Sequence, residues 1–209
     1  MEKRRLSCVV VTNLTYELGD PMFKIRLEWY KDVVLPCLLK QKDKDFDIAL
    51  KVNPKHMNIK VHDKVKLFTE KDYKGYGFTT WENVKGLKKY DIQCNLDSDD
   101  IVNEHYVSLI KEAVRSGNMD KPMHIQFQPL VIDTVHGDAK YMKIIYNPKQ
   151  GSAFYAIFFP DKEKEYFFIK EYSHWIMPRL FKRHIIYANG VCWIVINGLN
   201  IRTKSIKRI

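Results

Sequence analysis

The chain has 209 residues, 45% of them hydrophobic, which suffices for one globular domain or a tight pair of subdomains around a buried core. Aromatic residues make up 13% of it, and glycine and proline number only 9 and 8, so the composition excludes a disordered or collagen-like chain. A net charge of +10 favours anionic partners such as nucleotides, nucleic acids or lipid headgroups, but it does not identify the chemistry.

The first half of the chain alternates strand and helix patterns. Residues 6–11 form an apolar run rich in β-branched side chains, which predicts a buried strand. Apolar residues then recur at helical spacing over 23–39, where Pro36 should kink or interrupt the helix, and 46–52 predicts a second strand. This order of strand, helix and strand favours a parallel sheet covered by helices.

The middle of the chain leads into an acidic cluster. Residues 53–89 are polar and predict only a weak strand at 65–69. Residues 90–96 predict another strand, which runs directly into the acidic sequence 97–100. The apolar stripe over 101–114 predicts a helix immediately after that sequence.

After Gly117 the pattern changes to period-two, aromatic-rich runs, which predict a second half dominated by strands. Expected strands cover 124–127, 130–135, 141–146, 154–159, 166–169, 185–187 and 191–196, and one helix is expected at 172–181. The fold class is therefore α/β, with parallel β-α units first and a mixed or antiparallel region after them.

Cysteine usage and hydropathy indicate where the protein works. Cys8, Cys37, Cys94 and Cys192 are far apart and include no Cys-x-x-Cys pair, so we expect buried thiols in a reducing compartment. The basic N-terminus precedes too short an apolar stretch for a signal peptide, and no segment approaches the ~20 apolar residues of a membrane span. We expect a soluble, cytoplasmic protein without a membrane span.

The acidic cluster carries the strongest chemical signal. Along an extended strand, residues i and i+2 point to the same side about 6.6 Å apart, so Asp97 and Asp99 can aim both carboxylates into one pocket. Open α/β sheets bind ligands at this carboxyl end of their strands, and carboxylates completed by phosphate oxygens and water suit Mg²⁺ or Mn²⁺. The alternative is an acidic turn that only caps the following helix, a role for which Asp100 is the candidate.

The same cluster resembles a known motif. The string Leu96-Asp97-Ser98-Asp99-Asp100, directly after a strand, looks like the Asp-x-Asp motif of glycosyltransferases with the type-A, nucleotide-binding fold. Residues 35–46, with Gln41, resemble the Pro-Ser-Leu, Gln and Phe stretch of proteins assigned as rhamnosyltransferases, and Arg26 resembles the arginine that precedes it. Size and character are also similar to the N-terminal domain of a chlorella-virus glycosyltransferase involved in capsid-protein glycosylation.

The late part of the chain resembles the same group except at one position. Ser173-His174 and residues 193–200 resemble motifs in which a strand containing Trp leads to His-Gly-x-Asn. Here Asn197 stands at the His position, followed by Gly198 and Asn200. A late His is a frequent metal ligand in these folds, so the third protein ligand stays open.

The resemblance implies a metal-dependent glycosyltransferase with a mixed, mostly parallel central sheet flanked by helices. It would move a hexose or deoxyhexose from a nucleoside diphosphate sugar, expected to be UDP-linked, to a glycan or glycoprotein such as a viral capsid protein, in the host cytoplasm if viral. Mn²⁺ or Mg²⁺ would bridge the diphosphate and stabilise the charge on the departing nucleotide.

The expected domain organisation follows from the same resemblance. We expect one domain over 1–209, with a nucleotide-sugar-binding part at 1–116 and a strand-rich, acceptor-side part at 117–209. The closing basic segment 201–209 directly follows an expected strand, so we expect the domain to belong to a longer polypeptide.

Each candidate residue has an implied role and an ordinary alternative. Asp99 is the first choice for direct metal contact and catalysis, and Asp97 would share the metal or hold the ribose. Thr12 and Asn13 are placed to meet the nucleotide, although an ordinary polar turn explains them equally well. Arg26 and Lys51 could neutralise phosphate or could simply be solvated charges. His174 could be catalytic or merely packed, and His184 is a weaker candidate. Possible bases without a supporting pattern are Asp133, Asp138 and Glu171. Inversion or retention at the anomeric carbon stays open.

Two other functions fit parts of the sequence. A nucleotidyltransferase also needs paired carboxylates and a metal, but the first strand is followed by Thr12-Asn13-Leu14-Thr15 instead of a glycine-rich phosphate loop. A nucleic-acid-binding module would use the positive charge and the aromatic residues. The aromatic residues of 154–168 follow a strand pattern typical of a core, with no RNA-binding signature, so no specific nucleic-acid partner is expected.

Overall fold

The structure is a computed structural model that describes residues 4–14, 20–68, 90–133, 140–143, 154–160, 182–186 and 190–196. Its helices are α1 (Asp20–Trp29), the π-helical η1 (Tyr30–Val34), α2 (Leu35–Leu39), the 3-10 helix η2 (Pro54–His56) and α3 (Tyr106–Ser116). Its strands are β1 (Cys8–Asn13), β2 (Asp47–Lys51), β3 (Val65–Phe68), β4 (Ile92–Asn95), β5 (Ile101–Val102), β6 (Met123–Phe127), β7 (Leu130–Asp133), β8 (Lys140–Lys143), β9 (Tyr155–Phe158), β10 (Lys182–Ile186) and β11 (Cys192–Ile196). The predicted strand at 166–169 and helix at 172–181 lie outside the described residues.

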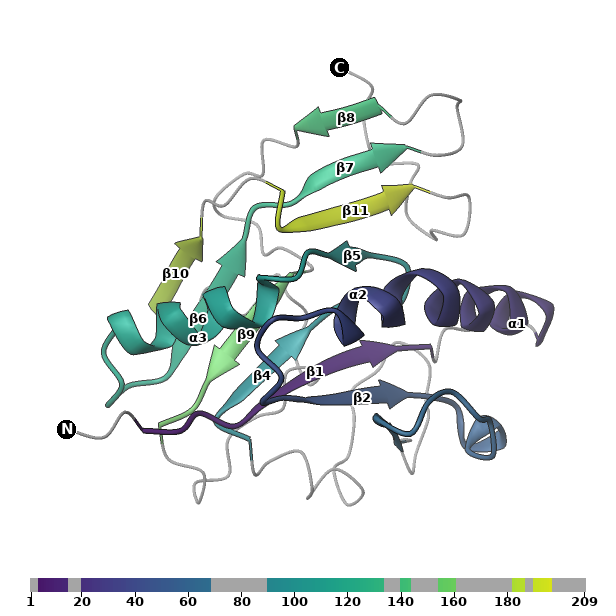
Figure 1. Ribbon diagram of the computed structural model, residues 1–209, viewed down its shortest axis with the longest axis horizontal. Coiled ribbons are helices and arrows are strands. Elements are labelled where there is room, and N and C mark those ends of the chain that lie inside the picture. The colour runs from purple at the N-terminus through teal and green to yellow at the C-terminus, as the bar shows by residue number, and fades with distance from the viewer. Residues whose placement is uncertain are drawn as a thin grey trace.

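A seven-stranded sheet in the order β10-β6-β9-β4-β1-β2-β3 forms the centre of the fold. Every neighbouring pair is parallel except those made by β9, which runs antiparallel to both β4 and β6. A smaller sheet, β5-β11-β7-β8, lies beyond the carboxyl end of β6 (Figure 1). In the same view, α2 and α3 lie in front of the central sheet, and α1 extends past the tip of β1. This arrangement confirms the predicted α/β class with a mixed, mostly parallel central sheet. Strands from both predicted parts of the chain belong to that one sheet.

The predicted interruption of the first helix takes the form of a π-helical turn. α1, η1 and α2 follow one another without a gap, and the backbone N–H of Leu35 donates to the carbonyl of Tyr30, five residues earlier. Pro36 sits in the first turn of α2, where a missing N–H costs least. The helix is therefore π-helical just before the proline, and it continues as an α-helix to Leu39.

The predicted helix over 101–114 is wrong at its beginning. Ile101 and Val102 form β5, which pairs antiparallel with Trp193 and Cys192 of β11, and α3 starts only at Tyr106. These β-branched residues fit an extended edge as well as a helical stripe, and pairing with a strand far along the chain decides between the two. Asn103 then ends the strand.

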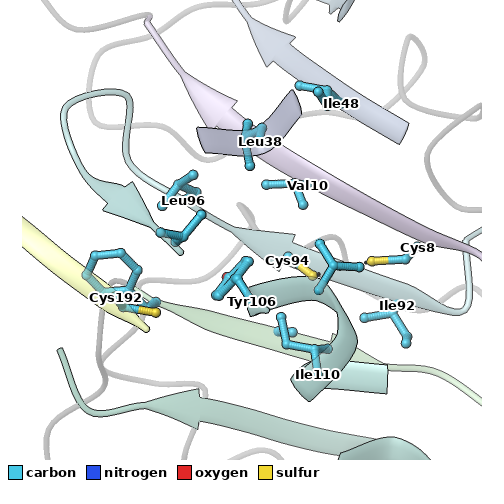
Figure 2. Packing of buried hydrophobic residues seen from close by; sticks show 14 of the residues in the cluster. Cys8, Val10, Leu38, Ile48, Ile92, Cys94, Leu96, Tyr106, Ile110 and Cys192 are labelled. Carbon is cyan, nitrogen blue, oxygen red and sulfur yellow. Dashed lines mark hydrogen bonds between the residues drawn. The ribbon is translucent and has the colours of Figure 1, made fainter. Parts of the chain in front are cut away.

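The central sheet has an apolar face and a polar face. Alternate residues such as Val10, Cys94 and Ile125 join one core cluster. Figure 2 shows part of this cluster, in which Val10 and Cys94 of the sheet lie near Leu38 of α2 and Tyr106 of α3. The intervening residues point to the opposite side, and many of them are polar although they are buried. We call this side the polar face; it carries Lys51, Gln93, Asn95, His124, Gln126 and Tyr155.

Candidate active site

Parallel strands β1, β2 and β4 end side by side at one edge of the central sheet. Asn13 is in register with Lys51, and Asn95 with Val11, so the carboxyl ends of the strands lie level with one another. From β1 the chain passes first to β2 on one side and later to β4 on the other, so the connections reverse direction at this point. Ligands of open α/β sheets bind at such a reversal, outside the carboxyl ends of the strands.

The acidic turn 97–100 occupies this edge. It begins where the backbone N–H of Leu96 donates to the carbonyl of Val11 at 3.1 Å, and it closes with the N–H of Asp100 donating to the carbonyl of Asp97 at 3.2 Å. β4 therefore delivers the turn directly beside the end of β1. The local geometry agrees with the predicted strand that runs into the acidic sequence.

Asp97 is half-buried and lies on the side of the polar face. It follows Asn95 by two residues, and Asn95 is paired across the sheet with Tyr155 of β9. Burial, with the negative charge of Asp97 adding to it, raises the pKa of the Tyr155 hydroxyl. Among the described residues, the Asp97 carboxylate makes no ion pair, so it is the carboxylate of the turn that is best placed to meet a ligand.

Asp99 is held by α1 and is only 5% exposed. Its Oδ2 lies 3.0 Å from a guanidinium nitrogen of Arg26, and its backbone carbonyl accepts a hydrogen bond from the indole N–H of Trp29 at 3.3 Å. Burial raises the pKa of Asp99 to about 6; the Arg26 guanidinium opposes this rise and the negative charge of Asp97 adds to it. The structure thus brings two of the predicted residues, Arg26 and Asp99, into direct contact.

Asp100 does not cap the following helix, which corrects the role suggested for it. Its Oδ1 accepts a hydrogen bond from the backbone N–H of Val195 in β11 at 3.1 Å, and α3 begins after His105, which makes no capping bond through its side chain. Burial raises the pKa of Asp100 well above its usual range, and the charges of Asp99 and Asp97 add to the effect. Asp100 therefore ties the acidic turn to the smaller sheet.

The structure separates the other predicted residues between the two faces. Asn13 is half-buried and Lys51 is 3% exposed, and both point to the polar face at the same edge as Asp97. Thr12 shares the apolar face with Val10, is fully buried, and donates through its hydroxyl to the carbonyl of Ala49 at 3.4 Å. A nucleotide would reach Thr12 only after that contact opened. His184 lies on β10 and Asp133 ends β7, while Asp138, Glu171, His174 and Asn197 lie outside the described residues.

The polar face supplies residues that sequence reasoning missed. Tyr155 is 2% exposed, and its ring lies edge-on to that of His124 with centroids 5.6 Å apart. Gln126 is in register with Tyr155. The available signal was the alternation of polar with apolar residues inside short strands, as in Met123–Phe127, where His124 and Gln126 stand between apolar neighbours.

The acidic turn fits a divalent cation that is completed by a substrate. No group of three or more His, Cys, Asp or Glu side chains suitable for a metal occurs in the described part of the chain. Mg²⁺ does not need such a cage, because it is usually bound by one or two carboxylates together with phosphate oxygens and water. Asp97 offers one such carboxylate at the ligand-binding edge, whereas Asp99, two residues further on, is paired with Arg26.

These features define the class of fold: the chain has the type-A fold of glycosyltransferases, with its acidic turn at the end of β4. It is similar to residues 1–349 of S. aureus TarS in complex with UDP-GlcNAc, with a TM-score of 0.55 and 12% identity over 91% of this chain and 58% of that one. The TarS complex with UDP gives a TM-score of 0.56 and 13% identity over 91% and 60%.

The chain thus spans about three fifths of the length of these TarS chains. At such identities the likeness concerns the fold. No protein-family model matches the sequence, and no curated protein matches it either. Within the described residues, no helix combines the length and apolar character needed to cross a bilayer.

Proposed function

We propose that the protein is a glycosyltransferase that uses a nucleoside diphosphate sugar, with UDP as the nucleotide. The observation that carries the proposal is the position of Asp97, a half-buried carboxylate at the reversal point between β1 and β4. The TarS structures that share this fold contain UDP-GlcNAc and UDP, which supports the choice of donor.

The proposed donor site uses the side chains at the carboxyl ends of the strands. Asp97 would hold Mn²⁺ or Mg²⁺, and the ion would supply Lewis-acid chemistry for the departing nucleotide. Lys51 adds positive charge at the same edge, where it favours an anionic ligand, and Asn13 offers an amide for hydrogen bonds to the nucleoside. Asp99 shares the cation only if its contact with Arg26 opens.

The transferred sugar is a hexose or deoxyhexose, and the acceptor is a glycan or glycoprotein. A viral capsid protein is the specific acceptor that the sequence resemblance suggests. His174 stays a catalytic candidate on the strength of that resemblance. The roles of Thr12 and Arg26 at the nucleotide require their side chains to leave the contacts seen in this structure.

The test is a screen of UDP-sugars for thermal stabilisation with and without Mn²⁺, followed by product analysis with the donor that stabilises most. Ligand binding to the folded state raises the apparent stability by mass action. A glycosyltransferase releases UDP and leaves the sugar on an acceptor, whereas a nucleotidyltransferase does not release UDP from the sugar. Release of UDP that requires Asp97 supports the proposal, and stabilisation by no nucleotide sugar argues against it.

A further inference from the structure

A cavity of about 310 Å³ lies beside the first residues of β2 and β3. Its apolar wall consists of Leu38 and Leu39 at the end of α2 and of Phe46 and Ile48 around the beginning of β2. Figure 2 shows Leu38 and Ile48 well away from Ile110 of α3, at the margin of the core cluster. Leu39 and Phe46 are half-buried, so the cavity reaches from the core to the surface.

The cavity is separate from the proposed donor site. Asp47 lines it at the first position of β2, whereas Lys51 ends the same strand at the edge that carries Asp97. Four residues of extended strand span about 13 Å. A molecule in this cavity would therefore lie at the opposite end of the strand, outside the proposed function.

Lysine side chains outnumber carboxylates around the cavity. Three lysines and two aspartates line it, namely Lys44, Lys64, Lys66, Asp47 and Asp63. The Lys66 ammonium lies 2.6 Å from Oδ2 of Asp47, so the charges of these two residues offset each other. Two cations, Lys44 and Lys64, are left with one carboxylate, that of Asp63.

The lysines outside this ion pair are placed to meet an anion. The Lys44 ammonium donates to the carbonyl of Leu39 at 2.8 Å, which holds it beside the apolar wall. An ammonium has three donors, so Lys44 keeps two for a ligand or for water. Lys64 and Asp63 are both exposed, and neither forms an ion pair with a described residue.

We infer that this cavity binds a small amphipathic anion, with its apolar body against the wall formed by α2 and β2 and its acidic group near Lys44 and Lys64. Ligand pockets begin at about 300 Å³ and combine apolar walls with a few polar groups that fix the orientation of the ligand. A medium-chain fatty acid has the matching chemistry, an apolar chain and a single carboxylate. An amphipathic cation is disfavoured, because among the described lining residues only Asp63 is left to meet it.

The test compares three ligands that share one eight-carbon chain and differ in charge: octanoate, 1-octanol and octylamine, which is protonated at pH 7. Saturation-transfer NMR titrations with the full chain measure their affinities without any need for enzymatic activity. Octanoate should bind at least about threefold more tightly than octanol, and protonated octylamine should bind more weakly than either. The inference is overturned if octanoate shows no saturable binding, or if octanol or octylamine binds as tightly as octanoate.

A pair of lysine variants separates a local contact from the overall positive charge of the protein. Lys64→Glu should weaken octanoate binding at least about fivefold. Lys60→Glu makes the same charge change at an exposed position that does not line the cavity, and it should stay within about twofold of wild type. Equal losses in the two variants would show that only the net charge matters and would overturn the assignment.

A third variant tests the apolar wall. Leu39→Trp puts a larger side chain into the cavity from a half-buried position and should abolish octanoate binding. Unchanged binding in this variant would overturn the assignment, and the surface variants of Lys64 and Lys60 still decide the matter if Leu39→Trp does not fold.

Vesicles of phosphatidylglycerol distinguish a free anion from a lipid within a membrane. Any co-sedimentation of this basic protein with the vesicles should be the same for wild type and Leu39→Trp. Loss of co-sedimentation in Leu39→Trp would assign the cavity to a membrane lipid and would overturn the inference of a free ligand.

Discussion

The carboxylate of Asp100 and the backbone N–H of Val195 form a buried hydrogen bond of 3.1 Å between the acidic turn and β11. Asp100 lies in the turn between β4 and β5, whereas Val195 belongs to β11, and the two residues are 95 positions apart in the sequence. Asp100 accepts the hydrogen bond from a backbone N–H that is also buried and that belongs to a strand of the smaller sheet. The position of the proposed site thus depends on contacts from the smaller sheet as well as from α1.

Two substitutions of Asp100 should distinguish the effect of its hydrogen bond on stability from the effect of its charge. Asp100→Asn keeps an acceptor oxygen for Val195 and removes a buried negative charge, so at pH 7 its free energy of unfolding should equal or exceed that of wild type. Asp100→Ala leaves the Val195 N–H without this acceptor and should lose about 1–3 kcal/mol. Urea denaturation of the three proteins measures the difference, and equal losses in both variants would contradict this role.

The raised pKa of Asp99 predicts how stability depends on pH. Between its ordinary value of 3.8 and about 6, the folded protein keeps a proton on Asp99 that the unfolded chain has lost. Stability from this group is therefore lost as pH rises through that window, by up to about 1.4 kcal/mol per pH unit. Denaturation of wild type and Asp99→Asn at several pH values measures their free energies of unfolding. From pH 4 to 6, the free energy of unfolding of the variant should rise relative to that of wild type. A constant difference would refute the assignment.

Lys111 of α3 is a second buried charge. Its surroundings predict that Asp43→Asn and Lys111→Met lose different amounts of stability. Its ammonium donates to Oδ1 of Asp43 at 2.9 Å and to the carbonyl of Asp45 at 2.6 Å, and the exposed fractions of Lys111 and Asp43 side chains are 2% and 20%. Asp43→Asn leaves a buried ammonium without its closest carboxylate and should cost about 3 kcal/mol. Lys111→Met leaves a carboxylate that water can reach and should cost about 1 kcal/mol. Chemical denaturation at pH 7 compares them, and the reverse order would show that water already solvates Lys111.

The class of fold and the position of the acidic turn after a strand could be predicted because their signals are local. The apolar run that forms β1, the helical spacing that follows it and the acidic sequence 97–100 each lie within a few residues. The sequence also indicated that the acidic turn would follow a strand, as β4 shows. Which strands neighbour β4 is decided by pairing across the whole chain.

The contacts that the sequence does not predict join residues far apart along the chain. The sequence offers Arg26 either to a phosphate or to solvent, and it gives no signal of the contact with Asp99, which is 73 positions away. Ile101 and Val102 were expected in a helix, but their strand conformation depends on β11. The periodicity of a short segment holds no information on such partners, because tertiary pairing overrides local preference.

The central claim is that Asp97 anchors a cation-dependent site for the nucleotide of a UDP-sugar. The most direct measurement is calorimetric titration of UDP into wild type, Asp97→Asn and the exposed control Asp120→Asn, each with Mn²⁺ and with a chelator. Wild type and the control should bind UDP at least about tenfold more tightly with Mn²⁺, because the cation offsets the repulsion between carboxylate and diphosphate. Asp97→Asn should lose this dependence while staying folded. Equal binding of UDP by wild type in Mn²⁺ and in chelator, or an unchanged dependence in Asp97→Asn, would contradict the claim.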